Sequence, residues 1–484
     1  LYIFTDDGGG QIAINTSRHE QSLRRELLQD GPFEEKLYIL QYLFTINAAR
    51  ARSIIPPPER FAQLSRERHA ILLAFGEAMR DGSFRVSVPA AELKLLSKRE
   101  PSPAYAHFAL ALYYSSYSKG GLAIEAAKAE VSNHPSPASR ELLVDLYRRY
   151  GDLEALGQLQ SDPQFAPFID SLLRRDIALQ TMDWPVLVRT LLPVAYKGTP
   201  LATLILALLA GAAWASLLVR FAGPLSWSSR AAQLALPALL LGAVSAHLTI
   251  LAIYLQEYQL GLERGDDLIS QVIYCVAGIG LREEFLKLLC FMPLIPFLSK
   301  RANELEILIV ASLVGLGFAI EENVGYFQSS QGLDAVGRFV TANFLHLSLT
   351  GLCGLTLTQA ILYRGSYINA AASTFGLAVL AHGAYDAFII VPELREYALV
   401  SLIVFILISY QFFIWVRHLR TSWRSTISLS AHFTLGLVLV FGTSYLVLAW
   451  QTGPVNAFLA LTEEVLGLAI LLVMFYREIP EDIY

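Results

Sequence analysis

The sequence has little charge and very little cysteine. Only 16% of its 484 residues are Asp, Glu, Lys or Arg, whereas soluble globular proteins carry about 25%. The three cysteines, Cys275, Cys290 and Cys353, are too few for a disulfide scaffold and are not spaced like zinc ligands. A net charge of −5 at pH 7 provides no basic surface for nucleic acid. These absences argue against an ordinary cytosolic enzyme, a disulfide-rich domain and a nucleic-acid-binding protein.

Long apolar runs are missing from residues 1–197, which hold most of the charge. From about Leu201 onward, continuously apolar runs of roughly 20 residues recur, which is the length that a membrane-spanning helix needs. We expect about nine spans, at 199–219, 231–256, 268–298, 305–327, 338–361, 367–391, 397–416, 429–451 and 455–476. The sequence therefore predicts an all-α protein, with a soluble helical domain at 1–197 and a polytopic transmembrane helix bundle at 198–484.

A short repeat lies within the soluble half. Ser102-Pro103-Ala104 recurs as Ser136-Pro137-Ala138, and Leu112-Tyr113 recurs as Leu146-Tyr147, both at an offset of 34 residues. That period is typical of tetratricopeptide (TPR) repeats, which are stacked helical hairpins. The pattern favours a TPR-like region at about 102–165 that binds a protein or peptide; the alternative is a chance resemblance between two helical hairpins.

The loop charges predict an orientation in the plasma membrane. One face carries most of the basic loop residues, Arg220, Arg230, Lys300, Arg301, Arg364, Arg417, Arg420 and Arg424. The positive-inside rule makes that face, and with it the C-terminus, cytoplasmic. Residues 1–197 are then outside the cytoplasm, which requires an upstream signal or anchor, and residues 1–4 are interpreted as its end.

Ionisable residues occur inside the predicted spans, where they are costly and typically functional. The third to sixth spans carry Glu283, Glu284 and Lys287, then Glu322 and Asn323, then His346, and finally His382 and Asp386. Counted from the span ends, Glu283, Glu322, His346 and His382 share a layer of about 12 Å in the non-cytoplasmic half of the membrane. Carboxylates and imidazoles at one depth can activate water, either alone or on a bound divalent metal.

These residues carry a family resemblance. The motifs Glu283-Glu284-x-x-Lys287, Phe318-x-x-x-Glu322-Asn323, a lone His346 and His382-x-x-x-Asp386 follow one another on successive spans. In this pattern, which covers residues 270–390, the sequence resembles the PrsW family of intramembrane proteases, within the wider group of CAAX-type and bacteriocin-processing membrane proteases.

The resemblance implies hydrolysis of a peptide bond in or near the membrane segment of a membrane-anchored protein, for example a regulator like an anti-sigma factor. By the resemblance, Glu283 or Glu284 is the general base, Lys287 orients it, and Asn323 belongs to the catalytic motif. His382, fixed by Asp386, is a ligand or an oxyanion donor. The resemblance leaves open whether a metal takes part. If it does, Zn²⁺ or another divalent ion is expected on Glu284, Glu322, His346 and His382.

Another class of protein also fits buried Glu and His residues. An ion- or proton-coupled transporter would place such groups along its path, and Glu463-Glu464 in the last span adds slight support. The inverted repeat common in transporters is not visible in the sequence. Other intramembrane proteases fit less well, because no His-Glu-x-x-His motif is present.

Overall fold

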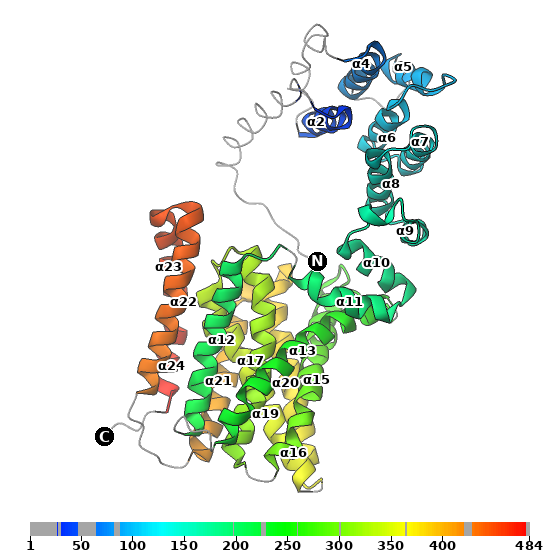
Figure 1. Cartoon of the computed structure of the whole chain (residues 1–484). Coiled ribbons are helices and arrows are strands. Elements are labelled where there is room, and N and C mark those ends of the chain that lie inside the picture. The colour runs from blue at the N-terminus through cyan, green and yellow to red at the C-terminus, as the bar shows by residue number, and fades with distance from the viewer. Residues whose placement is uncertain are drawn as a thin grey trace. The chain divides into compact units, whose positions relative to one another are not determined.

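The computed structural model describes residues 27, 31–46, 64–81, 88–196, 198–223, 229–258, 260–299, 302–363, 365–420 and 428–480. The chain divides into two compact units, Leu1–Thr190 and Leu191–Tyr484, with the boundary inside α11 (Trp184–Ala195). Every regular element among the described residues is helical (Figure 1), which confirms the predicted fold class there. Residues 1–4 and the loop residues Lys300, Arg301, Arg364 and Arg424 lie outside the described part.

The first unit consists of short helices around a hydrophobic core of its own. They are α2 (Phe33–Ile46), α4 (Arg66–Asp81), α5 (Val88–Ser97), α6 (Ala106–Ser116), α7 (Gly120–Asn133), α8 (Pro137–Arg149), α9 (Leu153–Gln160), η2 (Ala166–Phe168) and α10 (Ser171–Thr181). The repeated pairs Leu112-Tyr113 and Leu146-Tyr147 are buried in α6 and α8. Ser136 caps α8 by accepting a hydrogen bond from the Ser139 N–H, whereas α6 begins four residues after Ser102. The TPR-like character of this region stays a prediction.

Glu130 links two helices of this unit. Its carboxylate is 2% exposed and accepts hydrogen bonds from the backbone N–H groups of Tyr105 (2.6 Å) and Phe108 (3.2 Å) at the start of α6. Those N–H groups have no partner inside their own helix. The Glu130 side chain therefore supplies the cap that the residue preceding α6, Tyr105, does not provide.

We expect Glu130→Ala to destabilise the first unit by about 2 kcal/mol, since it leaves buried donors unpaired. Burial raises the pKa of Glu130 above its ordinary value. The Glu130 carboxyl group therefore binds its proton more tightly in the folded state than in the unfolded state. The resulting contribution to stability is fully present below the unfolded pKa of about 4.3 and is lost as pH rises through the folded pKa. Thermal melts of the full chain at several pH values measure both effects; a melt unchanged by Glu130→Ala would contradict the capping role.

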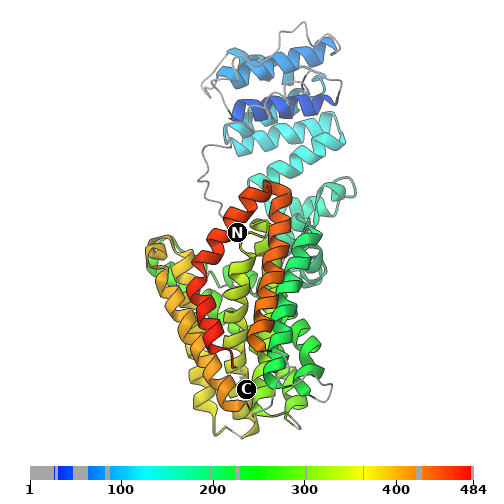
Figure 2. The ribbon, with the colours of Figure 1, turned by 90° about the vertical axis from the view of Figure 1, so that its left-hand side faces the viewer.

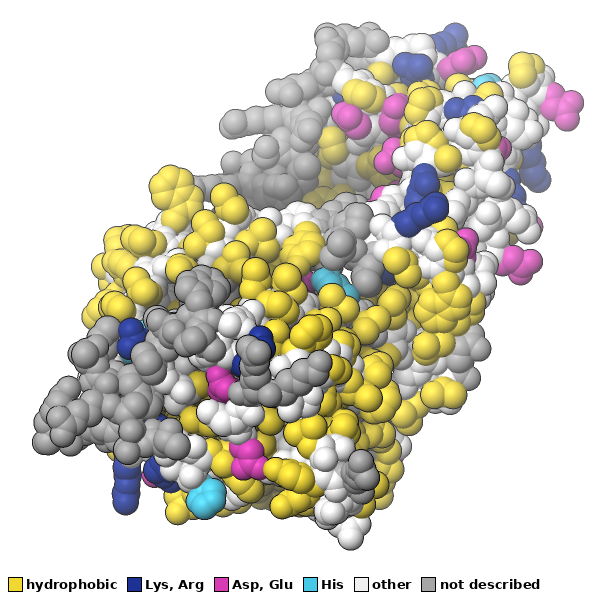
Figure 3. Space-filling model, turned by 60° about the horizontal axis from the view of Figure 1, so that its bottom comes forward, with side chains coloured by type: hydrophobic (Ala, Val, Ile, Leu, Met, Phe, Trp, Pro, Cys, Tyr) yellow, Lys and Arg dark blue, Asp and Glu magenta, His cyan; other side chains and the backbone are white. Residues whose placement is uncertain are grey.

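The second unit is a bundle of long helices. They are α12 (Leu201–Ala222), α13 (Arg230–Tyr258), α14 (Leu268–Ile273), the π-helical η3 (Tyr274–Gly280), α15 (Leu281–Phe291), η4 (Met292–Leu294), α16 (Ile295–Leu298), α17 (Glu304–Ser329), α18 (Ala335–Val340), α19 (Ala342–Leu362), α20 (Ile368–Ile390), η5 (Pro392–Tyr397), α21 (Leu399–Leu419), α22 (Leu429–Thr452), α23 (Pro454–Gly467) and α24 (Ala469–Glu478). In Figure 2, α22 and the α23–α24 pair form the orange and red hairpin. Hydrophobic side chains cover much of the visible surface of this unit (Figure 3), as lipid contact requires.

The described residues contain seven helices that are long and apolar enough to cross a membrane, and eight if a bent pair is counted as one span. The chain is a multi-pass membrane protein, and the count of nine stays a prediction. Two predicted spans are irregular. Residues 268–298 stay helical throughout but change hydrogen-bond pattern, with a π-helical segment at 274–280 and prolines at 293 and 296. Residues 455–476 bend by 56° between α23 and α24, next to Gly467.

Glycines allow the central helix α17 to pack backbone against backbone. A Cβ on Gly315 would lie 2.3 Å from the carbonyl oxygen of His346 on α19, and one on Gly317 would lie 2.1 Å from that of Leu239 on α13. Residues without a Cβ allow this close approach, which brings the backbone of His346 against α17.

Candidate active site

Helix α15 carries the paired glutamates. Glu284 and Lys287 are fully buried and Glu283 is 7% exposed. The ammonium of Lys287 donates to Glu284 Oε1 at 2.8 Å and lies 3.6 Å from Glu283 Oε2. It also lies 4.1 Å from the centre of the Phe318 ring, a cation–π contact that helps to hold the charge away from water. Lys287 therefore orients Glu284 more closely than Glu283.

The imidazole of His382 on α20 faces both glutamates. Its Nδ1 lies 2.8 Å from Glu284 Oε1, and its Nε2 lies 3.7 Å from Glu283 Oε2 and 3.5 Å from Asp386 Oδ2. Because a carboxylate only accepts hydrogen bonds, Nδ1 carries the proton and Nε2 of the neutral ring keeps a lone pair. His382 is thus fixed by the hydrogen bond that it donates to Glu284, while the predicted partner Asp386 lies farther away.

His346 on α19 completes the group of charged and polar side chains. Its Nδ1 accepts a hydrogen bond from the Lys287 ammonium at 2.7 Å, and its Nε2 lies 3.1 Å from Glu322 Oε2 on α17. The rings of His346 and His382 are 5.1 Å apart. Side chains from α15, α17, α19 and α20 therefore converge on one buried site, as the shared depth of their spans predicts.

Arg338 on α18 is a site residue that the motif reasoning missed. Its guanidinium donates to Glu322 Oε2 at 2.6 Å and to Asn323 Oδ1 at 2.6 Å. Asn323 in turn donates to Asn343 Oδ1 at 2.7 Å. Asn323 thus links Arg338 to α19 by hydrogen bonds and makes none to the paired glutamates. Arg338 could have been recognised in the sequence, because it is a charged residue at the start of the predicted span 338–361.

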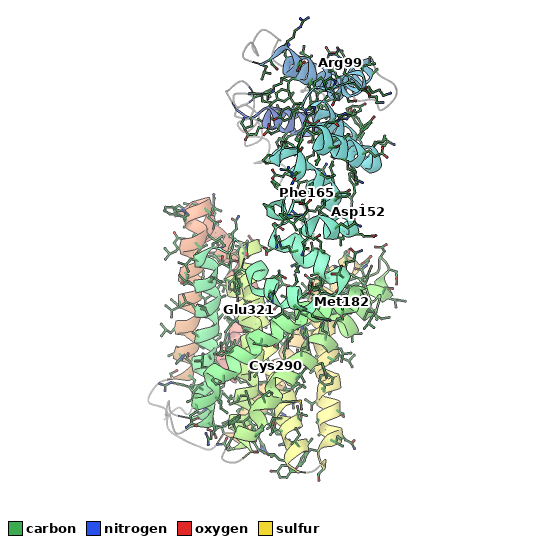
Figure 4. All side chains as sticks on the ribbon, turned by 45° about the vertical axis from the view of Figure 1, so that its right-hand side comes forward. Arg99, Asp152, Phe165, Met182, Cys290 and Glu321 are labelled. Atoms are coloured by element: carbon green, nitrogen blue, oxygen red, sulfur yellow. The ribbon has the colours of Figure 1, made fainter. Side chains whose placement is uncertain are left out.

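The first member of the other glutamate pair, Glu321, points away from the site. Glu321 accepts hydrogen bonds from the Tyr196 hydroxyl at 2.7 Å and lies 3.2 Å from His247 Nε2 on α13. Figure 4 labels Glu321 on α17. Adjacent helical residues diverge by about 100°, so Glu321 and Glu322 face different neighbours. Tyr196 could not be found from the sequence, because its contact spans 125 residues.

One carboxylate and two imidazoles could hold a metal ion. One ligand atom each from Glu283, His346 and His382 lie within 4.8 Å of one another, and Glu283 Oε2 is buried without a hydrogen-bond partner. This donor set suits Zn²⁺ or a similar ion. It differs from the predicted set, because Glu284 Oε1 is bound by Lys287 and His382 and Glu322 Oε2 by Arg338 and His346.

The charge of the site also fits a divalent cation. Its carboxylates are Glu283, Glu284, Glu322 and Asp386, and its fixed cations are Lys287 and Arg338. With all of them ionised, two negative charges remain in a buried site, where charges must be paired or coordinate a metal. Both nitrogens of the His346 ring are engaged, so ligation by His346 would replace its contact with Lys287 or with Glu322.

Two glycines set the distance between the glutamates and His382. A Cβ on Gly383 would lie 2.5 Å from Val276 Cα in η3, and a Cβ on Gly280 would lie 2.6 Å from the Val379 carbonyl oxygen on α20. The π-helical η3 leads directly into α15, which carries Glu283 and Glu284. Helix α20 therefore rests on the segment that positions both carboxylates.

We expect Gly383→Ala to move α20 away from η3 and to lower turnover by about 100-fold, the effect of a displacement near 1 Å. Gly376→Ala on the same helix is the matched control, since a Cβ there meets nothing within 4 Å. Turnover and melting temperature of both variants in detergent provide the measurement. Equal activity of the two variants would show that the close contact does not control the site.

The fold and the site define a multi-pass helical membrane protein with a buried Glu/His/Lys centre. Residues 230–414 match the family model described as PrsW family intramembrane metalloprotease. This match confirms the resemblance to the PrsW family in the motifs. No curated protein and no solved structure gave a significant match. The family match supports an intramembrane protease and does not favour a transporter.

Proposed function

We propose that the protein hydrolyses a peptide bond in or near the membrane segment of a membrane-anchored protein, with a water activated at the Glu/His centre. The observation that carries this proposal is the convergence of Glu283, His346 and His382 within 4.8 Å inside a PrsW-family membrane bundle. A regulator of the anti-sigma-factor kind is the substrate class that we propose, on the basis of the family resemblance.

Glu283 is the proposed proton acceptor for the water. Its Oε2 is buried and makes no hydrogen bond, so it is available to a substrate or a water. Glu284 is bound by Lys287 and His382, and therefore holds these two groups in place. With Nδ1 bound to Glu284, His382 presents Nε2 on the side of Glu283, where it can receive or return a proton.

Arg338 and Glu322 complete the proposed arrangement. Arg338 neutralises Glu322, and Glu322 fixes His346 through Nε2. If a divalent metal is bound, Glu283, His346 and His382 would hold it, and it would acidify a water and polarise the scissile carbonyl. Lys287 stays a positioning residue, because its ammonium is occupied by Glu284 and His346.

The location of the site and the partner of the first unit are also proposals. The distribution of basic loop residues supports an active site in the non-cytoplasmic half of the plasma membrane and a cytoplasmic C-terminus. A reporter fused after Tyr484 would test this, and an external signal would contradict it. The 34-residue repeat supports a protein or peptide partner on the first unit, which a pull-down with and without residues 102–165 would test.

Reconstitution tests the function directly. The protein is placed in liposomes together with a panel of single-pass reporter proteins, and cleavage is followed on gels. We expect wild type to cleave at least one reporter, His382→Ala to lose cleavage and His418→Ala to retain it, since His418 is exposed on α21 outside the site. Cleavage that survives in His382→Ala would remove the assignment of the site.

A further inference from the structure

The segment that carries Arg338 is held by residues outside the family match at 230–414. The Trp214 indole on α12 donates to the Phe339 carbonyl oxygen at 2.7 Å. The Ser444 hydroxyl on α22 donates to the Gly332 carbonyl oxygen at 2.6 Å. The Glu464 carboxylate on α23 accepts a hydrogen bond from the Gly337 N–H at 2.7 Å. These three contacts bracket Arg338 from both sides.

Glu464 makes the contact nearest to Arg338. Gly337 lies in the first turn of α18, where backbone N–H groups have no partner inside the helix, so the carboxylate supplies that partner. A Cβ on Gly337 would lie 2.8 Å from Glu464 Oε1, and glycine is therefore the residue that fits. The other oxygen, Oε2, is buried and makes no hydrogen bond. The contact ties α23 to the backbone of α18.

The contact leads to the active site in two further steps. Arg338 follows Gly337 directly and donates to Glu322 Oε2 at 2.6 Å. The same oxygen lies 3.1 Å from His346 Nε2. A shift of α18 would move the guanidinium and, with it, the carboxylate that orients His346.

We propose that Glu464 is a positioning residue of the active site, which fixes α18 so that Arg338 holds Glu322 against His346. For its effect on turnover the inference rests on the proposed protease function. The inference assigns a role to α23, which lies outside the family match. It also accounts for a glutamate pair in an apolar segment, since Glu464 faces α18 whereas Glu463 is exposed.

The first assay needs no substrate. Hydrogen–deuterium exchange is measured for the peptide covering 332–341 in nanodiscs. We expect Glu464→Ala to raise exchange in this peptide at least about tenfold, because a buried backbone hydrogen bond is lost. Glu464→Gln keeps a side-chain carbonyl that accepts from Gly337 and should exchange like wild type. Glu463→Ala is the matched control and should leave exchange unchanged.

The second assay measures turnover of a reporter that the wild type cleaves. Glu464→Ala should lower kcat about tenfold with KM unchanged, and Glu464→Gln should restore kcat. If Glu464 acts through Arg338, adding Glu464→Ala to Arg338→Ala should cause no further loss. A merely structural role would not produce this non-additivity.

Two outcomes would overturn the inference: unchanged exchange at 332–341 in Glu464→Ala, or losses in the double variant that simply add. A wild-type protein that cleaves no reporter would instead refute the proposed protease function, while the exchange assay would still test the contact between Glu464 and α18. The two failures are therefore read from separate measurements.

Discussion

Glu283→Gln is expected to lower turnover of the cleaved reporter by about 10³-fold, because the amide has the same shape but cannot take a proton from water. Glu283 Oε2 is the buried oxygen without a hydrogen-bond partner at the centre of the site. Lys287 Nζ lies 3.6 Å from Glu283 Oε2, which is too far for a hydrogen bond, so the substitution removes only a weak ion pair. We therefore expect the melting temperature to stay close to that of wild type.

Glu284→Gln provides the comparison that separates the two neighbours. The amide oxygen can still accept from Lys287 and His382, but both hydrogen bonds lose the negative charge and are weakened, and a loss of about 10- to 100-fold is expected. Glu393→Gln, in the exposed η5, is the control for loss of an acidic charge. A larger loss for Glu284→Gln than for Glu283→Gln would move the role of base to Glu284, which the sequence had left open.

Removal of divalent metal is the second prediction with a large effect. If Glu283, His346 and His382 hold an ion, dialysis against a chelator should lower turnover by about 10³-fold, since a Lewis acid contributes several kcal/mol to the barrier. Added Zn²⁺ should restore it. Metal analysis of the purified protein should find bound ion in wild type and much less in His346→Ala and His382→Ala.

The metal measurement has a second informative result. Full activity in chelator, together with no bound metal in wild type, would contradict a metal centre and leave Glu283 as the base of a metal-free hydrolase. Bound metal that persists in both histidine variants would show that the ion lies elsewhere. His247→Ala is a suitable control for loss of an imidazole, because His247 pairs with Glu321 outside the site.

Much of the site could be predicted because polar residues in lipid are costly. That cost makes Glu283, Glu322, His346 and His382 stand out in apolar spans, and helical spacing indicates which neighbours share a face. The close approach at Gly315 and Gly317 was predictable as well, since residues without a Cβ allow helix backbones to meet.

The sequence by itself determined the helical class, the membrane spans in outline and the polar residues of the site, because each depends on composition and on spacing within one helix. The tertiary structure decided the contacts of each polar atom: Glu284 bound by His382, Glu283 Oε2 without a hydrogen bond, Arg338 on Glu322, and Glu464 on the backbone of α18. It also showed where the helix at 268–298 becomes π-helical and where the span at 455–476 bends. Such contacts join residues up to 127 positions apart, and they depend on how helices pack against one another, which the periodicity of a single helix does not contain.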